Sequence, residues 1–421
     1  MAMPVDAIYM VAGKGTRLDP LTRFMPKPLI PICNKSPLVQ TMEQAASAGV
    51  TNHYLKLVTN PGMFLVSLGD SIMNTKISYA LHESGLVTAG GVRKVMEDYK
   101  IPKDRPVWVF SGDIFCPELR MDDIVESHVS AISSHPEVIG TVGFKLFSAE
   151  SCVNRFGVAV INEDGIVRRF AEKPKTIEQA LAIYAEIENP GIKAASERAG
   201  EPLLPANASY YLLQGDFFDR LPKLASLDKP GLDFGSDIFP VLKDQVNAYF
   251  IDSPWLDVGT PRDYWKSQWY FMDVAMRFTG TFVKNWGSFG FDVTREGNTE
   301  IRSSVIGNGV YLRNVRADHA IIGEGCQLSD VDVSYSVVLP HTFVNMRRGC
   351  AANEGTIAQI ENSIIGGKII GGSFIDSFSI PTRRELRGAI AVPPLGYSKY
   401  IDIHDLPLTE EDLAEARRIA F

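Results

Sequence analysis

A glycine-containing loop with closely spaced basic residues follows the first apolar segment of the chain. The run Val11-Ala-Gly-Lys-Gly-Thr-Arg-Leu18 comes directly after a β-rich segment, and Lys27 stands between two prolines soon after. Glycines let a backbone approach a ligand closely and adopt positive φ angles. A loop that leaves a strand can direct successive N–H groups at phosphate oxygens. Arg17 and Lys27 would add cationic donors that neutralise a polyphosphate. The loop therefore predicts a phosphate-binding site.

This loop fits neither of the two best-known glycine patterns. It lacks the P-loop spacing, and the dinucleotide pattern Gly-x-Gly-x-x-Gly fails because Leu18 stands where the third glycine should be. A strand-to-helix turn with solvated Arg and Lys side chains is the alternative interpretation. The whole run of small and basic residues favours phosphate binding.

Two aspartates also follow β-rich segments. Asp113 ends Ser111-Gly-Asp directly after the segment 106–110, and Asp257 follows 249–251 with Gly259 nearby. Open α/β sheets bind ligands outside the carboxyl ends of their strands. Both carboxylates therefore stand where ligand contacts are expected, although either could instead cap a turn.

The elements that must position these residues alternate along most of the chain. Between Val5 and about Met276, short β-rich runs predict strands at 5–11, 106–110, 139–147 and 156–161, and helical spacing predicts helices at 38–48 and 177–188. Such alternation predicts an α/β fold with a mostly parallel sheet and helices on both faces. Residues 174–205 are predicted to be an insertion that is partly helical and ends in a proline-rich loop.

The sequence pattern changes after about Thr279. The segments Ser304-Val-Ile-Gly, Ala320-Ile-Ile-Gly, Ser336-Val-Val-Leu and Ser363-Ile-Ile-Gly line up, and Ile306, Ile322 and Val338 are 16 residues apart. Each of these three is followed six residues later by another aliphatic residue, namely Leu312, Leu328 and Val344. Stacked short coils would bury what one coil cannot, so the repeat predicts a parallel β-helix. An ordinary antiparallel β-domain is the alternative.

Composition narrows the class of protein. The 421 residues are 45% hydrophobic and 22% charged, with a formal net charge of −8, which excludes wholesale disorder and disfavours nucleic acid as the main partner. There is no apolar run of about 18 residues, and the first ten residues do not resemble a secretion signal. Five scattered cysteines without Cys-x-x-Cys spacing favour a reducing compartment over a zinc site. We expect a soluble cytoplasmic protein with at least two domains.

Several motifs together resemble the sugar-1-phosphate nucleotidylyltransferases, also called nucleotide-sugar pyrophosphorylases. They occur in the order found in that family, across about residues 5–270. They are Ala12-Gly-Lys-Gly-Thr-Arg-Leu, Pro20-Leu-Thr, Pro26-Lys-Pro, Ser111-Gly-Asp, Phe156-Gly, Phe170-Ala-Glu-Lys-Pro, Asn207-Ala, Asp233-Phe-Gly-Ser and Trp255-Leu-Asp-Val-Gly-Thr-Pro. The resemblance implies a Rossmann-like, mixed and mostly parallel sheet in a nucleotidyltransferase domain, followed by a left-handed parallel β-helix.

The changes in sequence pattern near Thr279 and Pro381 predict the domain limits. The catalytic domain would span 1–278 with the insertion at 174–205, the β-helix would span 279–380, and a tail would span 381–421 with a surface helix at 408–420. The aromatic residues Trp255, Tyr264, Trp265, Trp269 and Tyr270 have a spacing more typical of interdomain core than of a ligand stack.

The implied reaction joins a sugar 1-phosphate to a nucleoside triphosphate and releases pyrophosphate. An oxygen of the sugar phosphate attacks the α-phosphorus in line, so the protein positions groups and neutralises charge. The implied catalytic residues are Arg17, Lys27, Asp113, Lys173 and Asp257. The implied nucleotide-binding residues are Ala12, Gly13, Lys14, Gly15, Thr16, Arg17, Glu83 and Thr88. The implied sugar-phosphate-binding residues are Gly157, Glu172, Lys173 and Asn207. Asp113 and Asp257 would hold Mg²⁺, the expected cofactor.

The substrates stay open at this point. Within the family, the segments 237–242 and 255–264 favour GTP and mannose 1-phosphate, while 233–236 and 246–250 also resemble glucose-1-phosphate adenylyltransferases. Val87 stands where the family usually has a glycine in the base pocket, which admits a uridylyl transferase or an unusual sugar-like acceptor. A catalytically weak regulatory paralogue that binds a nucleotide sugar is the alternative of another class. His319 and His341 raise acyl transfer as a minor alternative. We expect a homo-oligomer formed through the β-helix.

Overall fold

The computed structural model describes residues 5–13, 15–18, 21–23, 25–58, 60–82, 85–223, 227, 229, 231–278, 288–289, 292–340, 342–345, 358–361, 364–365, 368–370, 374–375, 377–379, 386–387 and 401–402. The chain divides into two compact units, and both are discontinuous in sequence. The first unit comprises 1–14 and 37–256, and the second comprises 15–36 and 257–421. The predicted surface helix 408–420 lies outside the described residues.

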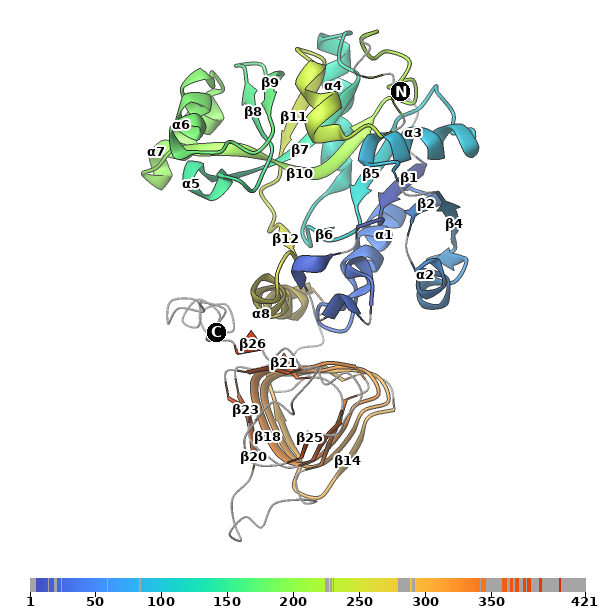
Figure 1. Cartoon of the computed structure of the whole chain (residues 1–421), viewed down its shortest axis with the longest axis vertical. Coiled ribbons are helices and arrows are strands. Elements are labelled where there is room, and N and C mark those ends of the chain that lie inside the picture. Colours follow the sequence, from blue (N-terminus) through green and yellow to red (C-terminus); the bar gives the residue numbers. More distant parts are fainter. Residues whose placement is uncertain are drawn as a thin grey trace. The chain divides into compact units, whose positions relative to one another are not determined.

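The first unit is built on a mixed sheet whose strand order is β11-β7-β10-β5-β1-β2-β4-β3 (Figure 1). These strands are β1 (Asp6–Met10), β2 (Asn52–Leu57), β3 (Ser71–Ile72), β4 (Thr75–Leu81), β5 (Val107–Ser111), β7 (Gly140–Ser148), β10 (Leu203–Leu213) and β11 (Val246–Phe250). Along this path only β10 and the edge strand β3 run opposite to the others. The predicted mostly parallel sheet is confirmed.

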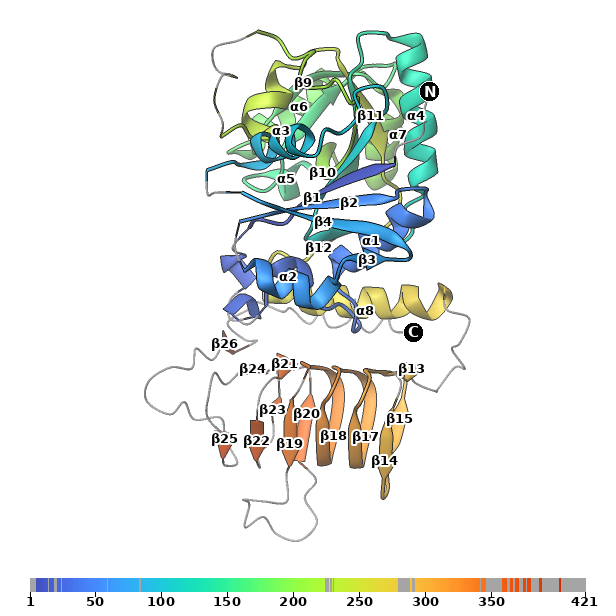
Figure 2. The ribbon, with the colours of Figure 1, turned by 90° about the vertical axis from the view of Figure 1, so that its right-hand side faces the viewer.

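Helices lie on both faces of this sheet, with α3 and α2 on opposite sides of β1, β2 and β4 (Figure 2). The helices of this unit are α1 (Pro37–Ser47), α2 (Pro61–Leu68), α3 (Thr88–Asp98), α4 (Met121–Ser134), α5 (Ala149–Cys152), α6 (Ile177–Glu186) and α7 (Pro190–Ala199). The shorter strands are β6 (Ile114–Phe115), β8 (Val158–Ile161), β9 (Val167–Ala171) and β12 (Leu256–Asp257). The predicted strands thus correspond to β1, β5, β7 and β8, and the predicted helices to α1 and α6.

The predicted insertion contains two capped helices. Thr176 accepts a hydrogen bond from the Gln179 backbone at the start of α6, and Asn189 caps α7 with Pro190 as its first residue. The proline-rich loop predicted at its end is wrong, because β10 begins at Leu203 and Pro205 pairs with Leu146 on β7. The pairing of β10 with β7 therefore overrides the local preference of proline for loops.

The second unit contains stacked parallel strands. β17 (Tyr311–Ile322) pairs with β18 (Gln327–Val338) over an offset of 16 residues, for example Leu312 with Leu328 and Ile322 with Val338. The strands that carry the predicted repeat positions stack in coils (Figure 1). Their aliphatic side chains share one buried apolar interior. Single residues with positive φ recur at the same offset, as at Asn314 and Asp330. This arrangement is compatible with the predicted β-helix, and its handedness stays a prediction.

The remaining strands of this unit are short. They are β13 (Ser288–Phe289), β14 (Thr294–Glu296), β15 (Glu300–Arg302), β16 (Val305–Ile306), β19 (Phe343–Asn345), β20 (Ala358–Glu361), β21 (Ile364–Ile365), β22 (Lys368–Ile370), β23 (Phe374–Ile375), β24 (Ser377–Ser379), β25 (Leu386–Arg387) and β26 (Ile401–Asp402). All pair in parallel except β24 with β26.

A second apolar core explains why residues 15–36 and the helix α8 (Pro261–Phe278) belong to the second unit. Trp265 and Trp269 are 1% exposed, and their rings meet edge to face at 5.5 Å. They pack in one cluster with Leu18, Ile30 and Ile321. The interpretation of these aromatics as core is confirmed for Tyr264, Trp265 and Trp269. The predicted limits at 278 and 380 stay predictions. Among the described helices, none is long and apolar enough to cross a membrane.

Candidate functional site

The carboxyl ends of three adjacent parallel strands place the start of the glycine loop. Met10 at the end of β1 pairs with Lys56 on β2 and with Ser111 on β5. The loop residues Ala12 and Gly13 follow directly, and a Cβ added to Gly13 would meet nothing within 4 Å. The backbone at Gly13 is thus open, at the sheet edge where ligands of α/β proteins bind. Lys14 lies outside the described residues.

Asp113 lies at this same edge of the sheet. It follows β5, and its carboxylate accepts a hydrogen bond from the Ser111 hydroxyl. The backbone N–H of Gly112 donates to the carbonyl of Met10 at 3.2 Å, which fixes the start of the turn that carries Asp113. The structure therefore places one predicted metal ligand beside the glycine loop.

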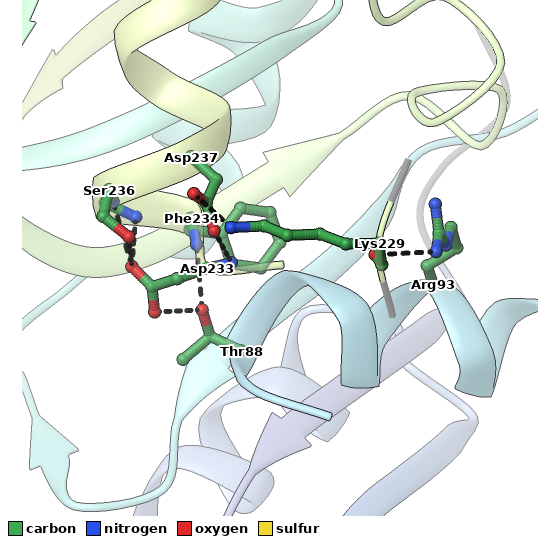
Figure 3. Close-up of polar contacts among 8 residues, drawn as sticks. Thr88, Arg93, Lys229, Asp233, Phe234, Ser236 and Asp237 are labelled. Carbon is green, nitrogen blue, oxygen red and sulfur yellow. Dashed lines mark hydrogen bonds and ion pairs between the residues drawn. The ribbon is translucent and has the colours of Figure 1, made fainter. Parts of the chain in front are cut away.

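A polar clamp ties the start of α3 to the Asp233-Phe-Gly-Ser segment (Figure 3). Thr88, the first residue of α3, donates its hydroxyl to Asp233 Oδ2 at 2.8 Å and accepts from the Phe234 backbone N–H at 2.9 Å. The other carboxylate oxygen of Asp233 accepts from the backbone N–H groups of Gly235 and Ser236 at 2.9 and 3.0 Å. The Thr88 hydroxyl therefore already donates its only hydrogen bond to Asp233.

Further contacts secure this clamp from the other side. The Asp233 backbone N–H donates to Asp237 Oδ2 at 2.9 Å, and Lys229 Nζ donates to Asp237 Oδ1 at 2.8 Å. Arg93 of α3 reaches the Lys229 carbonyl at 3.4 Å. Sequence reasoning missed the clamp, because its two halves are 145 residues apart along the chain.

Val87 does not strain the loop before α3. Its backbone is extended, with φ −72° and ψ −156°, so the position makes no demand for glycine. Its side chain is 46% exposed. Valine therefore fits the backbone at this position. Its exposed side chain affects only which ligand groups can approach the loop. Glu83 lies outside the described residues.

A second cluster brings the predicted sugar contacts together. A Cβ on Gly157 would lie 2.5 Å from Glu172 Oε2, and one on Gly235 would lie 2.7 Å from the same atom, so both glycines leave room for this carboxylate. The Asn207 backbone donates to the Gly157 carbonyl at 2.8 Å. Lys173 adopts a positive φ of 47°, and its ammonium contacts the Glu172 carboxylate. Four predicted residues therefore meet at one place.

Tyr211 is a member of this cluster that the sequence did not reveal. Its hydroxyl accepts from Asn207 Nδ2 at 3.0 Å, and its side chain is buried. Burial first, and then the nearby charges of Asp233 and Glu172, raise the pKa of Tyr211 to about 12. Tyr211 therefore keeps a neutral hydroxyl in the sugar cluster, while its ring packs against Phe234 of the clamp with the ring centroids 5.1 Å apart. Its only sequence signal is that it lies four residues after Asn207.

The second unit holds the rest of the predicted phosphate site. Gly15 has φ +63°, and a Cβ there would lie 2.9 Å from Thr22 Cγ2 and 3.0 Å from Lys27 Cβ. The Thr22 hydroxyl donates to the Gly15 carbonyl at 3.1 Å. Lys27 is buried, and its ammonium lies 3.1 Å from Asp257 Oδ1. Two predicted catalytic residues that are 230 positions apart in the sequence therefore form an ion pair.

A local cap begins the helix that follows Asp257. Thr260 donates to Asp263 Oδ2 at 2.8 Å and accepts from the Asp263 backbone N–H, which caps the start of α8. A Cβ on Gly259 would be 3.3 Å from both Asp257 Oδ2 and Asp263 Oδ2. Thr16 and Arg17 are exposed and begin a short helical turn that Leu18 anchors in the core.

The predicted magnesium ligands belong to different units, Asp113 to the first and Asp257 to the second. Each is an oxygen donor of the kind that Mg²⁺ binds, usually through one or two carboxylates together with substrate phosphates and water. Within the described part of the chain, no three His, Cys, Asp or Glu side chains gather as a metal site. The donor chemistry fits Mg²⁺, and the pairing of the two aspartates stays a prediction.

Comparison with known proteins gives a consistent family. A mannose-1-phosphate guanyltransferase of Schizosaccharomyces pombe is 27% identical over 267 residues, which cover 62% of this chain and 62% of that protein. A probable mannose-1-phosphate guanylyltransferase of Oryza sativa is 26% identical over 375 residues, covering 86% and 91%. The chain thus spans about 62% of the length of the first relative.

Among solved structures, HddC from Yersinia pseudotuberculosis covers 63% of this chain and 99% of its own, with 21% identity and a TM-score of 0.47. The profile of the nucleotidyl transferase family matches residues 6–272. That span contains the glycine loop, both aspartates, the sugar cluster and the clamp. The chain therefore belongs to the nucleotidyl transferase family.

Proposed function

We propose that the chain transfers a nucleotidyl group from a nucleoside triphosphate to a sugar 1-phosphate, forming a nucleotide sugar and pyrophosphate. The observation that carries this proposal is the cluster of Glu172, Asn207 and Tyr211. It combines a carboxylate acceptor with an amide and a neutral hydroxyl, beside two glycines that leave space. Such a set suits a ligand with many hydroxyl groups.

The reaction then needs positioning rather than a covalent intermediate. A phosphate oxygen of the sugar 1-phosphate attacks the α-phosphorus, the bond from the α-phosphorus to the bridging oxygen breaks, and pyrophosphate leaves on the opposite side. Lys173 binds the sugar phosphate, while Arg17 and Lys27 neutralise the triphosphate. Mg²⁺, held by Asp113 and Asp257, would supply further charge neutralisation when bound.

Glu172 accepts hydrogen bonds from sugar hydroxyls in this mechanism. The backbone of Gly13 and Gly15 supplies N–H groups to phosphate oxygens. The ion pair between Lys27 and Asp257 holds both side chains in place before substrate arrives. These roles need no proton transfer to the protein, because the attacking phosphate oxygen is already ionised.

GTP and mannose 1-phosphate are the proposed substrates. Similarity to proteins named mannose-1-phosphate guanyltransferases supports this choice. Glucose 1-phosphate with ATP or UTP, or an unusual sugar-like phosphate, is the alternative that Val87 keeps open. A regulatory paralogue is the alternative of another class. The presence of Arg17, Lys27, Asp113, Lys173 and Asp257 in this chain argues for an enzyme.

A split between the two Michaelis constants tests the proposal. In a Mg²⁺-dependent pyrophosphate-release assay with GTP and mannose 1-phosphate, Glu172→Gln should raise KM for the sugar phosphate about tenfold and leave KM for GTP unchanged. The matched control is Glu186→Gln, which removes an exposed carboxylate paired with Arg169. Equal KM values in wild type and Glu172→Gln would contradict the assigned sugar site.

Assembly and location complete the proposal. Stacked coils present strand edges at their ends, which favours a homo-oligomer formed through the coils. A monomer at micromolar concentration in analytical ultracentrifugation would contradict this. The free cysteines Cys33, Cys116, Cys152 and Cys326 suit a reducing compartment, which supports a cytoplasmic location.

A further inference from the structure

Lys56 is a buried lysine that none of the motifs above includes. It lies near the end of β2 beside β1, and its side chain is only 3% exposed. Its ammonium donates to the Leu86 carbonyl at 2.6 Å, which is its one hydrogen-bond partner among the described residues. Burial lowers the pKa of Lys56. A buried amine with one carbonyl partner is costly, and an apolar side chain of similar length would avoid that cost.

The first turn of α3 is shaped around this lysine. A Cβ added to Gly91 would lie 2.7 Å from Lys56 Cε and 3.2 Å from Cδ, so any larger residue at this position would push the lysine side chain aside. The lysine therefore passes beneath α3 and reaches the peptide that joins Leu86 to Val87. That peptide belongs to the loop whose sequence resembles the base-pocket motif of the family.

The planar peptide links this contact to the surface of the loop. In a trans peptide the C=O and the following N–H point in opposite directions. Because the Leu86 carbonyl points at Lys56, the Val87 N–H points away from it. Among the described residues no acceptor binds this N–H, whereas the Val87 carbonyl accepts from Gly91 at 3.0 Å. The next residue, Thr88, is held by Asp233. Val87 is thus held on both sides, and among the described residues its N–H has no acceptor.

We propose that Lys56 is a positioning residue for the nucleotide base: it holds the Leu86 carbonyl and thereby aims the Val87 N–H at an acceptor atom of the base. This inference rests on the proposed nucleotidyl transfer, because it assigns the loop to the triphosphate substrate. The Val87 N–H can bind one acceptor atom of the base only if the peptide between Leu86 and Val87 keeps one orientation, and the bond from Lys56 holds that orientation. Lys56 itself contacts no substrate.

The experiment measures both Michaelis constants in full-length variants. Lys56→Met removes the donor but keeps the length of the side chain. It should raise KM for the nucleoside triphosphate about tenfold, through loss of one charge-assisted hydrogen bond that orders the loop. KM for the sugar phosphate and kcat should stay within about twofold of wild type. The ratio of kcat/KM between the preferred triphosphate and the next best should shrink.

Two further variants separate positioning from general damage. Lys56→Arg keeps a donor and should restore part of the nucleotide affinity. Gly91→Ala crowds the lysine from α3 and should reproduce the rise in nucleotide KM. The melting temperature of Lys56→Met should equal or exceed that of wild type, because a desolvated charge is removed. Lys193→Met is the matched control, since Lys193 also donates to a backbone carbonyl, that of Tyr184, at 3.0 Å.

The outcomes are distinct. Wild-type nucleotide KM and base selectivity in Lys56→Met would overturn the assignment of Lys56 alone. An equal rise in both Michaelis constants would overturn it as well, because the lysine would then support the whole fold. If wild type neither binds a triphosphate in calorimetry nor releases pyrophosphate, the proposed function falls, and this inference falls with it.

Discussion

Replacing Thr88 by valine tests whether its hydroxyl binds the nucleotide or holds Asp233 in the clamp. Valine has nearly the shape of threonine but no hydroxyl, so Thr88→Val deletes two hydrogen bonds at once. These are the 2.8 Å bond to Asp233 Oδ2 and the 2.9 Å bond from the Phe234 N–H. The helix α3 and the segment 233–236 then lose their direct side-chain link.

The loss of stability depends on which hydrogen bonds Asp233 and Phe234 keep in the Thr88→Val variant. Asp233 retains the Gly235 and Ser236 N–H groups on its other oxygen, so its carboxylate stays partly satisfied. The Phe234 N–H loses the hydroxyl acceptor. One lost hydrogen bond to a charged group, with one donor left unpaired, destabilises the clamp by about 2 kcal/mol. That free energy corresponds to roughly thirtyfold more frequent local opening.

Amide hydrogen exchange at Phe234 measures this opening directly. We expect exchange about thirtyfold faster in Thr88→Val, near wild-type exchange in Thr88→Ser, and little change in the exposed control Thr51→Val. Unchanged exchange at Phe234, combined with a loss of nucleotide binding, would refute the reasoning. The hydroxyl would then act on the nucleotide and not on Asp233.

Three further predictions concern other parts of the chain. Asp113→Asn should lower kcat by on the order of a hundredfold while the melting temperature holds; near-normal turnover would contradict its role as a metal ligand. Gly15→Ala should destabilise the fold by about 1 kcal/mol or more, through its positive φ and the Thr22 contact, measured by urea titration; Gly49→Ala, with positive φ but open space, should cost less. Burial lowers the pKa of His128 to about 4 from 6.5, so the unfolded state binds the extra proton between these values. The free energy of unfolding should therefore decrease as the pH falls from 6.5 towards 4. If the melting temperature of His128→Gln depends on pH as strongly as that of wild type, this explanation is wrong.

Local patterns predicted the elements of the fold well. The buried apolar runs before the glycine loop and before Asp113 form β1 and β5, because a central parallel strand buries both faces. The 16-residue repeat places Leu312 against Leu328, since stacked coils must repeat their inward side chains. In both cases the signal lies within a short window of sequence.

Local sequence patterns did not predict the contacts between distant segments of the chain. The ion pair of Lys27 with Asp257 joins residues 230 positions apart, although the family motifs named both. Tertiary packing alone decides which groups pair with the Tyr211 hydroxyl, the Asp233 carboxylate and the Lys56 ammonium, so the sequence did not reveal these contacts. Pro205 lies within β10 for the same reason, against its local preference for loops.

The central claim is best tested with a substrate matrix. ATP, GTP, UTP, CTP and dTTP are each combined with the 1-phosphates of glucose, mannose, galactose and glucosamine in the presence of Mg²⁺, and pyrophosphate release is measured. The account predicts strong release for one combination, GTP with mannose 1-phosphate, and its loss when Mg²⁺ is chelated. No release above background from any combination, by a folded protein that still binds a nucleotide, would contradict it.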